Sequence, residues 1–194
     1  MLLNSLKIKE LFNYSIVLFG LILLGTGCNK PTSKQEKLQK TIEQYQNKTL
    51  TLPLPDSILH KGQMTSIRKS GLKSNKLKIS TYINGKCHSC IKGFSKWLDL
   101  IDIANRSTNF NIVFYVYTND KNEFKEYFYP SVIHDYPLII DKKKQYLKSN
   151  EIPEFGQFKT FLLNNNNRVI LVGNPINNEK LMKLYKEEIN KRLD

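Results

Sequence analysis

Residues 77–90 read LKISTYINGKCHSC and join a strand pattern to two cysteines spaced three positions apart. The run Leu77 to Ile83 fits a β-strand, and Asn84-Gly85 marks a turn after it. A helix that begins at Cys87 points unpaired backbone NH groups and the positive end of its dipole at that sulfur, which stabilises a thiolate. The stretch therefore predicts a strand, a turn and a helix, with thiol-disulfide exchange as its chemistry.

The residues around the two cysteines are expected to tune them. Lys86 adds positive charge beside Cys87, and His88 and Ser89 stand between the cysteines. His88 can donate a hydrogen bond to the Cys87 thiolate or place charge near it, which makes a disulfide more oxidising; the alternative is that His88 points to solvent. We expect an accessible Cys87 with a pKa below the ordinary value of about 8.5, and a more buried, less reactive Cys90.

The N-terminal segment has the pattern of an export signal. Lys7 and Lys9 precede an apolar run, Ile16 to Leu24, and Gly25-Thr26-Gly27 leads directly into Cys28. This ending resembles a bacterial lipoprotein lipobox, although Leu24 stands four residues before the cysteine instead of three. The resemblance implies a signal peptide over residues 1–27 and a lipid on Cys28. An uncleaved membrane anchor is the alternative, but the apolar run is short for a span of about 20 residues.

The chain has three cysteines. If Cys28 carries lipid, Cys87 and Cys90 have only each other as intramolecular partners, in an exported location where disulfides persist. A disulfide that closes so short a loop adds little stability, which argues against a purely structural role. A merely local crosslink remains the alternative. Zinc would lack two of its usual four ligands. A copper site formed by both sulfurs and His134 stays open. We expect no resident metal and no cofactor besides a redox-active disulfide.

Length and charge limit the remaining classes. Residues 28–194 suit one domain, which we divide into a tether with a short helix over 28–48 and a folded domain over 49–194. The formal net charge is +13. An exported location and scattered lysines argue against a nucleic-acid partner. Attraction to an anionic membrane surface or to acidic proteins explains this charge better. The alternative is that the charge only keeps the protein surface hydrated.

Hydrophobic periodicity predicts an α/β domain with the order β, α, β, α, β, β, α. After a short helix over 34–45, the expected elements are an edge or irregular strand at 49–54, a loop or weak strand at 60–76, a strand at 77–83, a helix after Cys90, a strand at 111–117, a helix at 122–129, a strand at 137–141, a helical turn at 142–148, a hairpin of 159–163 with 168–172, and a helix at 181–189. In the helix after Cys90, an apolar stripe at 94, 97, 98, 101 and 104 predicts a buried Trp97.

This order, with C-x-x-C at the start of the first core helix, resembles the thioredoxin superfamily over residues 75–194. The closer similarity is to redoxin and TlpA-like membrane-tethered thiol-disulfide oxidoreductases, and residues 158–175 resemble thioredoxin-like lipoproteins of the Bacteroidetes type. The resemblance implies a central mixed sheet flanked by helices, with Cys87 as attacking and Cys90 as resolving cysteine. It also implies exported thiol or disulfide proteins as substrates, a membrane electron donor, and a periplasm-facing site in the bacterial cell envelope.

The sequence departs from the superfamily at one position. Members usually carry a cis-proline just before the strand that begins here at Thr160, and this place falls at Phe158 or Lys159, with Pro153 several residues too early. A cis bond without proline costs about 2.5 to 4 kcal/mol, so we expect a trans bond. We further expect Phe158 and Lys159 to lie close to Cys87, where the ring or the charge shapes the docking groove in place of proline.

Two classes of function remain. One is a membrane-tethered oxidoreductase that acts on cysteines of exported proteins through Cys87 and Cys90. The other is a thioredoxin-like lipoprotein that has lost turnover and serves as a binding or assembly module, which the missing proline favours.

Overall fold

A computed structural model describes residues 33–54, 57–66, 76–120, 122, 124, 136–154 and 158–193. Contacts divide the chain into two units, Met1–Gln39 and Lys40–Asp194. The division falls within a helix, and the predicted division into a tether with a short helix over 28–48 and a domain over 49–194 stays a prediction. The expected signal peptide, Cys28, the expected helix at 122–129 for the most part, and His134 lie outside the described residues. No helix in the described part of the chain has the length and apolar character that a membrane span requires.

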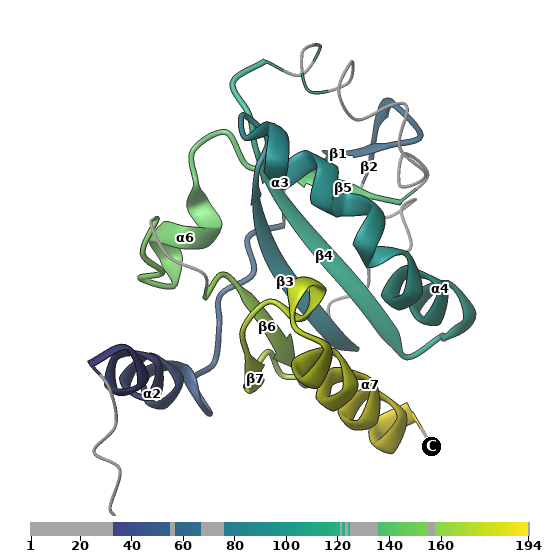
Figure 1. The fold of residues 1–194 in the computed structure, drawn as a ribbon. Helices are drawn as coiled ribbons and strands as arrows, with labels where there is room; N and C mark the ends of the chain where they lie inside the picture. Colours follow the sequence, from purple (N-terminus) through teal and green to yellow (C-terminus); the bar gives the residue numbers. More distant parts are fainter. Residues whose placement is uncertain are drawn as a thin grey trace, which may run out of the picture. The chain divides into compact units, whose positions relative to one another are not determined.

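Most expected elements are present, with small shifts in their ends. The helices are α2 (Ser33–Tyr45), α3 (His88–Lys92), η2 (Gly93–Trp97), α4 (Leu98–Arg106), α6 (Gln145–Ser149), η3 (Pro175–Asn177) and α7 (Glu179–Leu193), where η denotes a 3-10 helix. The strands are β1 (Ser57–His60), β2 (Gln63–Ser66), β3 (Leu77–Asn84), β4 (Phe110–Tyr117), β5 (Leu138–Ile140), β6 (Thr160–Leu163) and β7 (Val169–Val172). Figure 1 shows their arrangement.

The strands form one mixed sheet in the order β2-β1-β5-β4-β3-β6-β7. Strands β3 and β4 lie in the middle and pair in parallel from Leu77 opposite Phe110 to Asn84 opposite Tyr117. Helices α3 and α4, with η2 between them, make the crossover that a parallel pair requires. Strand β6 runs antiparallel to β3 and begins the β6-β7 hairpin, as the sequence predicted.

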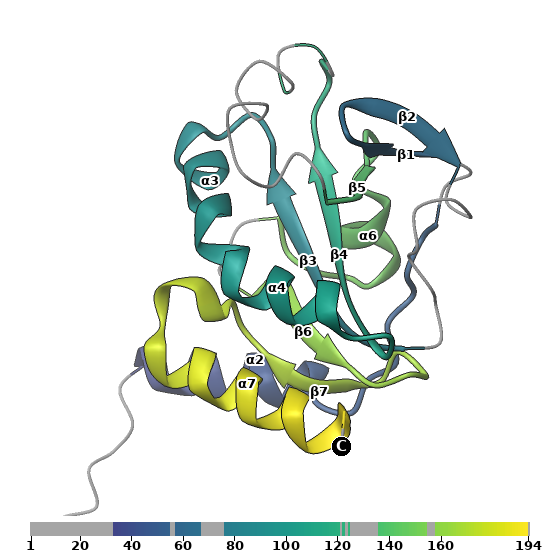
Figure 2. The ribbon, with the colours of Figure 1, turned by 90° about the vertical axis from the view of Figure 1, so that its right-hand side faces the viewer.

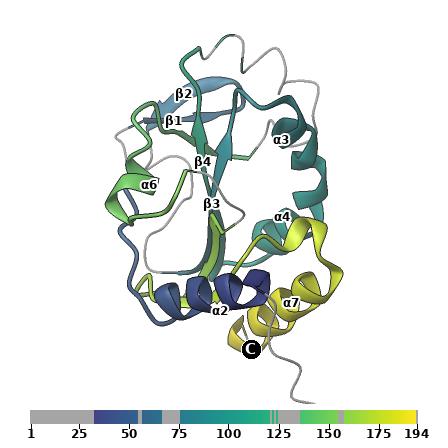
Figure 3. The ribbon, with the colours of Figure 1, turned by 60° about the vertical axis from the view of Figure 1, so that its left-hand side comes forward.

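Helices cover both faces of this sheet. In Figures 2 and 3, α3 and α4 lie on one face of the central strands and α6 lies on the other. The buried side chains follow the same division. One cluster joins Ile79 and Phe114 to Trp97 and to Tyr185 of α7, whereas the other joins Tyr82 and Tyr115 to Tyr146 of α6, and further residues complete each cluster. Alternate residues of each strand thus enter opposite cores.

A hairpin occupies the first part, up to Ser66, of the region 60–76, for which the sequence suggested a loop or a weak strand. Strands β1 and β2 pair around Lys61 and Gly62, whose φ angles of 48° and 70° are both left-handed. Two successive left-handed residues match the twist of a tight hairpin. Strand β1 also pairs with β5 at Leu59 opposite Leu138, which extends the sheet by two strands. Residues 67–75 lie outside the described part.

The segment 49–54 has no strand ladder and makes a single bridge, Thr49 with Arg168. The backbone of Thr51 is instead satisfied by a buried amide side chain. Its NH donates to Asn150 Oδ1 at 2.7 Å, and its carbonyl accepts from Asn150 Nδ2 at 2.8 Å. The irregular form that the sequence allowed for this segment is confirmed.

The helix predicted after Cys90 is interrupted. Gly93–Trp97 is a 3-10 turn between α3 and α4, yet the apolar stripe stays continuous. Phe94 and Trp97 are buried, and so are Ile101 and Ala104, while Leu98 is half-buried. Trp97 is therefore a core residue, as predicted.

Candidate functional site: the Cys87–Cys90 disulfide

Strand β3 ends three residues before Cys87, so Cys87 follows one end of the sheet. The turn after it depends on Gly85, whose NH donates to the carbonyl of Tyr117 at 2.8 Å. A Cβ at this position would lie 2.8 Å from that same carbonyl oxygen and 2.9 Å from the Phe124 ring. Only glycine permits so close an approach, because the nearest atom is backbone and cannot move aside. The Asn84-Gly85 signal in the sequence thus reflects a tertiary contact as well as a turn.

Asn84 shapes the next step. Its side-chain oxygen accepts from the NH of Lys86 at 3.1 Å, and its carbonyl accepts from the NH of Cys87 at 3.1 Å. Such a turn is typical of asparagine, whose side chain bonds to the backbone two residues ahead. The chain is thereby turned into α3 with Cys87 as its N-cap.

The Cys87 sulfur receives polar contacts at the start of the helix. The NH of Cys90 donates to Cys87 Sγ at 3.3 Å, and the Ser89 hydroxyl lies 3.2 Å from the same sulfur. A disulfide joins Cys87 to Cys90, with their Cα atoms 5.2 Å apart. In the reduced protein, these donors would favour a thiolate at Cys87 over one at Cys90. Tuning by Ser89 stays a prediction, and the His88 side chain lies outside the described residues.

The exposure of the two cysteines contradicts one expectation. Cys87 is half-buried and Cys90 is exposed, the reverse of the predicted order. The reason is the way α3 and η2 pack: Ile91 of α3 and Phe94 of η2 are buried in the core. Cys90 therefore projects on the outer side of the helix. The roles of attacking and resolving cysteine stay predictions, since hydrogen bonding favours Cys87 and access favours Cys90.

The residues in the place of the absent proline lie beside β3. The carbonyl of Lys159 accepts from the NH of Tyr82 at 3.1 Å, and the Phe158–Lys159 peptide is trans, as predicted. The same register, extended by one residue, sets Phe158 level with Ile83. Both residues thus approach the end of β3 that leads to Cys87. A direct contact of either side chain with the sulfur stays a prediction.

A cluster that the sequence did not reveal lies near the end of β3 from which the chain continues to Cys87. Lys86 Nζ is 5.4 Å and Lys144 Nζ 4.5 Å from the centre of the Tyr117 ring, and Lys159 Nζ is 5.2 Å from that of Tyr82. These separations allow cation–π attraction. We call these five residues the Lys–Tyr cluster. Tyr82 and Tyr117 stand on neighbouring strands, so the pattern of strand alternation was the only sequence signal available for it.

Electrostatics within the cluster follow from burial and charge. Glu154 forms an ion pair with Lys144, which lowers the pKa of Glu154. Burial lowers the pKa of Lys159. Burial raises the pKa of Tyr82, and the charges of Glu154 and Asp141 add to this effect. Tyr82 thus stays neutral and offers its ring face to the Lys159 ammonium group.

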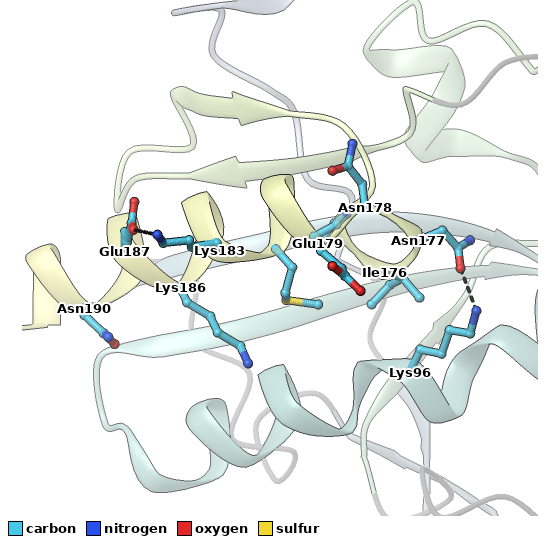
Figure 4. A pocket seen from close by; sticks show the side chains of 11 residues that line it. Lys96, Ile176, Asn177, Asn178, Glu179, Lys183, Lys186, Glu187 and Asn190 are labelled. Atoms are coloured by element: carbon cyan, nitrogen blue, oxygen red, sulfur yellow. Dashed lines mark hydrogen bonds and ion pairs between the residues drawn. The ribbon is translucent and has the colours of Figure 1, made fainter.

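A second feature is a groove of about 720 Å³ between η2 and the segment formed by η3 and α7 (Figure 4). Pro175, Ile176 and Met182 give it an apolar part. The lysines around it are already bonded: Lys96 Nζ to Asn177 Oδ1 at 2.7 Å, Lys183 Nζ to Glu187 at 3.8 Å and Lys186 Nζ to Asp99 at 3.0 Å. In the described part of the chain, no three His, Cys, Asp or Glu side chains gather as metal ligands would.

No family model matches the sequence, and no curated protein matches it either. Solved structures do resemble the fold. A putative thiol:disulfide interchange protein DsbE from Chlorobium tepidum aligns with a TM-score of 0.54 at 13% identity, over 73% of this chain and 97% of that one.

Two solved structures from Bacteroides are also similar to the fold of this chain. The thioredoxin domain of a thiol-disulfide oxidoreductase from Bacteroides vulgatus gives a TM-score of 0.51 at 14% identity, over 72% of this chain and 96% of that one. A thiol:disulfide interchange protein from Bacteroides sp. gives 0.55 at 15% identity, over 75% and 92%. The chain has the thioredoxin-like fold, as predicted, and carries a cysteine pair at the start of α3.

Proposed function

We propose that this protein is a thiol-disulfide oxidoreductase, tethered to a membrane of the bacterial cell envelope, that acts on cysteines of exported proteins. The observation that carries the proposal is an accessible Cys87–Cys90 disulfide at the N-terminus of a helix, on a thioredoxin-like fold. The NH of Cys90 and the hydroxyl of Ser89 at the Cys87 sulfur support Cys87 as the nucleophile.

In the reducing direction, the Cys87 thiolate attacks a substrate disulfide. A bond forms between Cys87 and one substrate sulfur, and the other substrate sulfur leaves as a thiolate that takes a proton from water. Cys90 then loses its proton and attacks the Cys87 sulfur, which releases the second substrate thiol and restores the Cys87–Cys90 disulfide. Two electrons have passed to the substrate. A membrane dithiol donor would return them, and the oxidising direction runs the same steps backwards.

Reduction of a protein disulfide such as that of insulin, with a dithiol as electron source, tests the activity. We expect turnover by the full chain, none by Cys87→Ser, and trapping of substrate as a mixed disulfide by Cys90→Ser. A chain that accelerates reduction no more than its Cys87→Ser variant does would contradict the proposal. Trapping by Cys87→Ser but not by Cys90→Ser would keep the activity and reverse the two roles.

The tether has a separate test. If Cys28 carries the lipid, Cys28→Ser abolishes acylation and blocks processing, while the domain still folds and still undergoes disulfide exchange. Mass spectrometry of the N-terminal peptide of the mature protein measures both effects. An unmodified Cys28 in the mature protein would refute the lipid anchor and leave the redox proposal untouched.

A second candidate is a binding or assembly lipoprotein without turnover. The trans Phe158–Lys159 peptide favours it, because neither residue is the proline that many thioredoxin-like proteins place there. Such a module would keep partner binding in the Cys87→Ser variant and would fail the turnover assay.

A further inference from the structure

The Lys–Tyr cluster brings together three segments that are distant in sequence. Lys86 precedes Cys87, Lys144 follows β5, and Lys159 precedes β6. Tyr117 lies under two of the ammonium groups and Tyr82 under the third. Lys86 directly precedes Cys87, so the cluster includes the residue that leads into the disulfide.

The cluster has more positive charge than its own carboxylates neutralise. Among the described residues, Lys144 pairs with Glu154, whereas Lys86 and Lys159 form no ion pair. The nearby Asp141 is committed to α6, since its two carboxylate oxygens accept from the NH groups of Gln145 and Tyr146 at 2.7 and 2.9 Å. These hydrogen bonds leave the charge of Asp141 in place, so three ammonium groups face the two carboxylates of Glu154 and Asp141, and a surplus of positive charge is available to a partner.

The local sequence strengthens this bias. No Asp or Glu occurs between Asp56 and Asp99, the stretch that contains both cysteines, while lysines recur throughout it. The groove beside α7 differs, because its lysines Lys96, Lys183 and Lys186 already bond to side chains of the same chain.

We propose that the Lys–Tyr cluster binds acidic residues that flank the cysteine of a substrate polypeptide. This inference rests on the proposed oxidoreductase function and adds a preference to it. In a mixed disulfide the two sulfurs are about 2.05 Å apart, and each residue of an extended chain spans about 3.3 to 3.6 Å. Carboxylates one to three positions from the substrate cysteine therefore come within reach of Lys86 and its neighbours.

A polypeptide fits this position better than an anionic membrane. Lys86 directly precedes Cys87, so a membrane that covered this lysine would also restrict access to the disulfide. A substrate must approach this sulfur in every cycle, and positive charge there accelerates the encounter with acidic segments.

The test uses the full chain with Cys90→Ser and three peptides that contain one cysteine between acidic, neutral or basic neighbours. Each peptide cysteine is joined through a disulfide to a thionitrobenzoate reporter. The Cys87 thiolate attacks the peptide sulfur, forms a mixed disulfide and releases the coloured thiolate, whose appearance gives the rate. Dividing by the neutral-peptide rate removes any effect of a substitution on the reactivity of Cys87.

We expect the acidic peptide to react roughly tenfold faster than the neutral one at low salt, with the advantage shrinking as salt is added. Lys86→Gln, Lys144→Gln and Lys159→Gln together should bring the ratio close to one. The matched control carries Lys96→Gln, Lys183→Gln and Lys186→Gln, which change the net charge equally, and should keep most of the advantage.

The outcomes separate the two proposals. Absence of reaction with every peptide, both in the Cys90→Ser chain and in a Cys87→Ser chain, would refute the proposed function. Equal rates for the three peptides would keep that function and overturn the acidic preference. Equal losses in both triple variants would assign the preference to the charge of the whole chain and overturn the role of the cluster. Loss of anionic-vesicle binding in the cluster variant, with the peptide ratio unchanged, would assign these lysines to the membrane and also overturn it.

Discussion

The two faces of the central sheet use different chemistry to fill their cores. On the face covered by α3, α4 and α7, Phe114 contacts the rings of Phe94, Trp97 and Tyr136 at centroid distances of 5.1, 5.3 and 5.6 Å. Among the described residues, three polar contacts lie in this core: the hydroxyls of Thr81 and Thr160 bond to each other, the Tyr136 hydroxyl accepts from the NH of Ile112, and the Tyr185 hydroxyl donates to the Gly173 carbonyl at 2.8 Å. Most of its other described side chains make apolar contacts.

The face covered by α6 is rich in tyrosine and contains buried polar groups. Tyr115 stacks on Tyr146 at 4.3 Å, and the Tyr146 hydroxyl bonds to Ser80 Oγ at 2.8 Å. Lys78 is only 1% exposed, and its ammonium donates to Asn167 Oδ1 at 2.7 Å and to the Asn164 carbonyl at 3.3 Å. This face buries a charged group and depends more on directional bonds, whereas the other depends more on volume and shape.

The contrast shows how one sheet supports two tasks. The apolar face anchors the helix that carries the disulfide, through Ile91 and Phe94. The tyrosine-rich face continues to the same end of the sheet, where Tyr82 and Tyr117 hold the three lysines. Substitutions on the first face should therefore alter the rate at which the disulfide is reduced. Substitutions on the second face should alter the free energy of unfolding through its buried hydrogen bonds and buried charge.

The largest effect is expected from Phe114→Ala. Phe114 is fully buried, and loss of a core phenylalanine ring costs about 3 to 5 kcal/mol of unfolding free energy. Because its neighbours support α3, the rate at which a small dithiol reduces the Cys87–Cys90 disulfide should rise as well. Denaturant unfolding and reduction kinetics measure the two quantities.

Phe161→Ala is the matched control on the other face. Phe161 is also fully buried, and its ring lies 5.2 Å from that of Tyr45. We expect a similar loss of stability with little change in the reduction rate. Equal changes of that rate in both variants would contradict a division of tasks between the faces.

Buried Lys78 should make stability depend on pH. Burial lowers its folded-state pKa to about 8, from the ordinary 10.5. Below pH 8 both states are protonated, and the fold carries the full cost of a buried charge. Between the two pKa values only the unfolded chain keeps the proton, so the unfolding free energy rises with pH, by roughly 3 kcal/mol in all.

Comparison with Lys78→Met isolates this contribution, because every other group titrates in both proteins. The unfolding free energy of the parent minus that of the variant should increase between about pH 8 and 10.5. A difference that is independent of pH would mean that Lys78 does not titrate in this range in the folded state.

The smallest effects on stability are expected from the stacked pair Tyr115 and Tyr146. Of the two hydroxyls, only that of Tyr146 has a hydrogen-bond partner among the described residues. Tyr146→Phe removes the partner of the buried Ser80 hydroxyl and should cost about 1 to 3 kcal/mol. The Tyr115 hydroxyl is buried and has no hydrogen-bond partner among the described residues, so Tyr115→Phe should be neutral or stabilise by about 1 kcal/mol. Parallel denaturant unfolding of the two variants gives the comparison. Equal losses would show that the Tyr115 hydroxyl is satisfied in solution.

The sequence by itself determined the features that depend on neighbouring residues. The strand from Leu77, the turn at Asn84-Gly85 and the start of a helix at Cys87 all follow from short-range patterns, and each is confirmed. The buried Trp97 and the β6-β7 hairpin were predictable for the same reason, because periodicity and turn residues act locally. Together with the order of elements, these features sufficed for the thioredoxin-like fold.

Only the tertiary structure decided the features that depend on which segments meet. Strand β1 follows from pairing with β5, and the exposure of Cys90 follows from the packing of Ile91 and Phe94. The Lys–Tyr cluster likewise requires the register that places Tyr82 and Tyr117 on one face of adjacent strands. Such contacts join residues far apart in the chain, and local sequence patterns do not specify their partners.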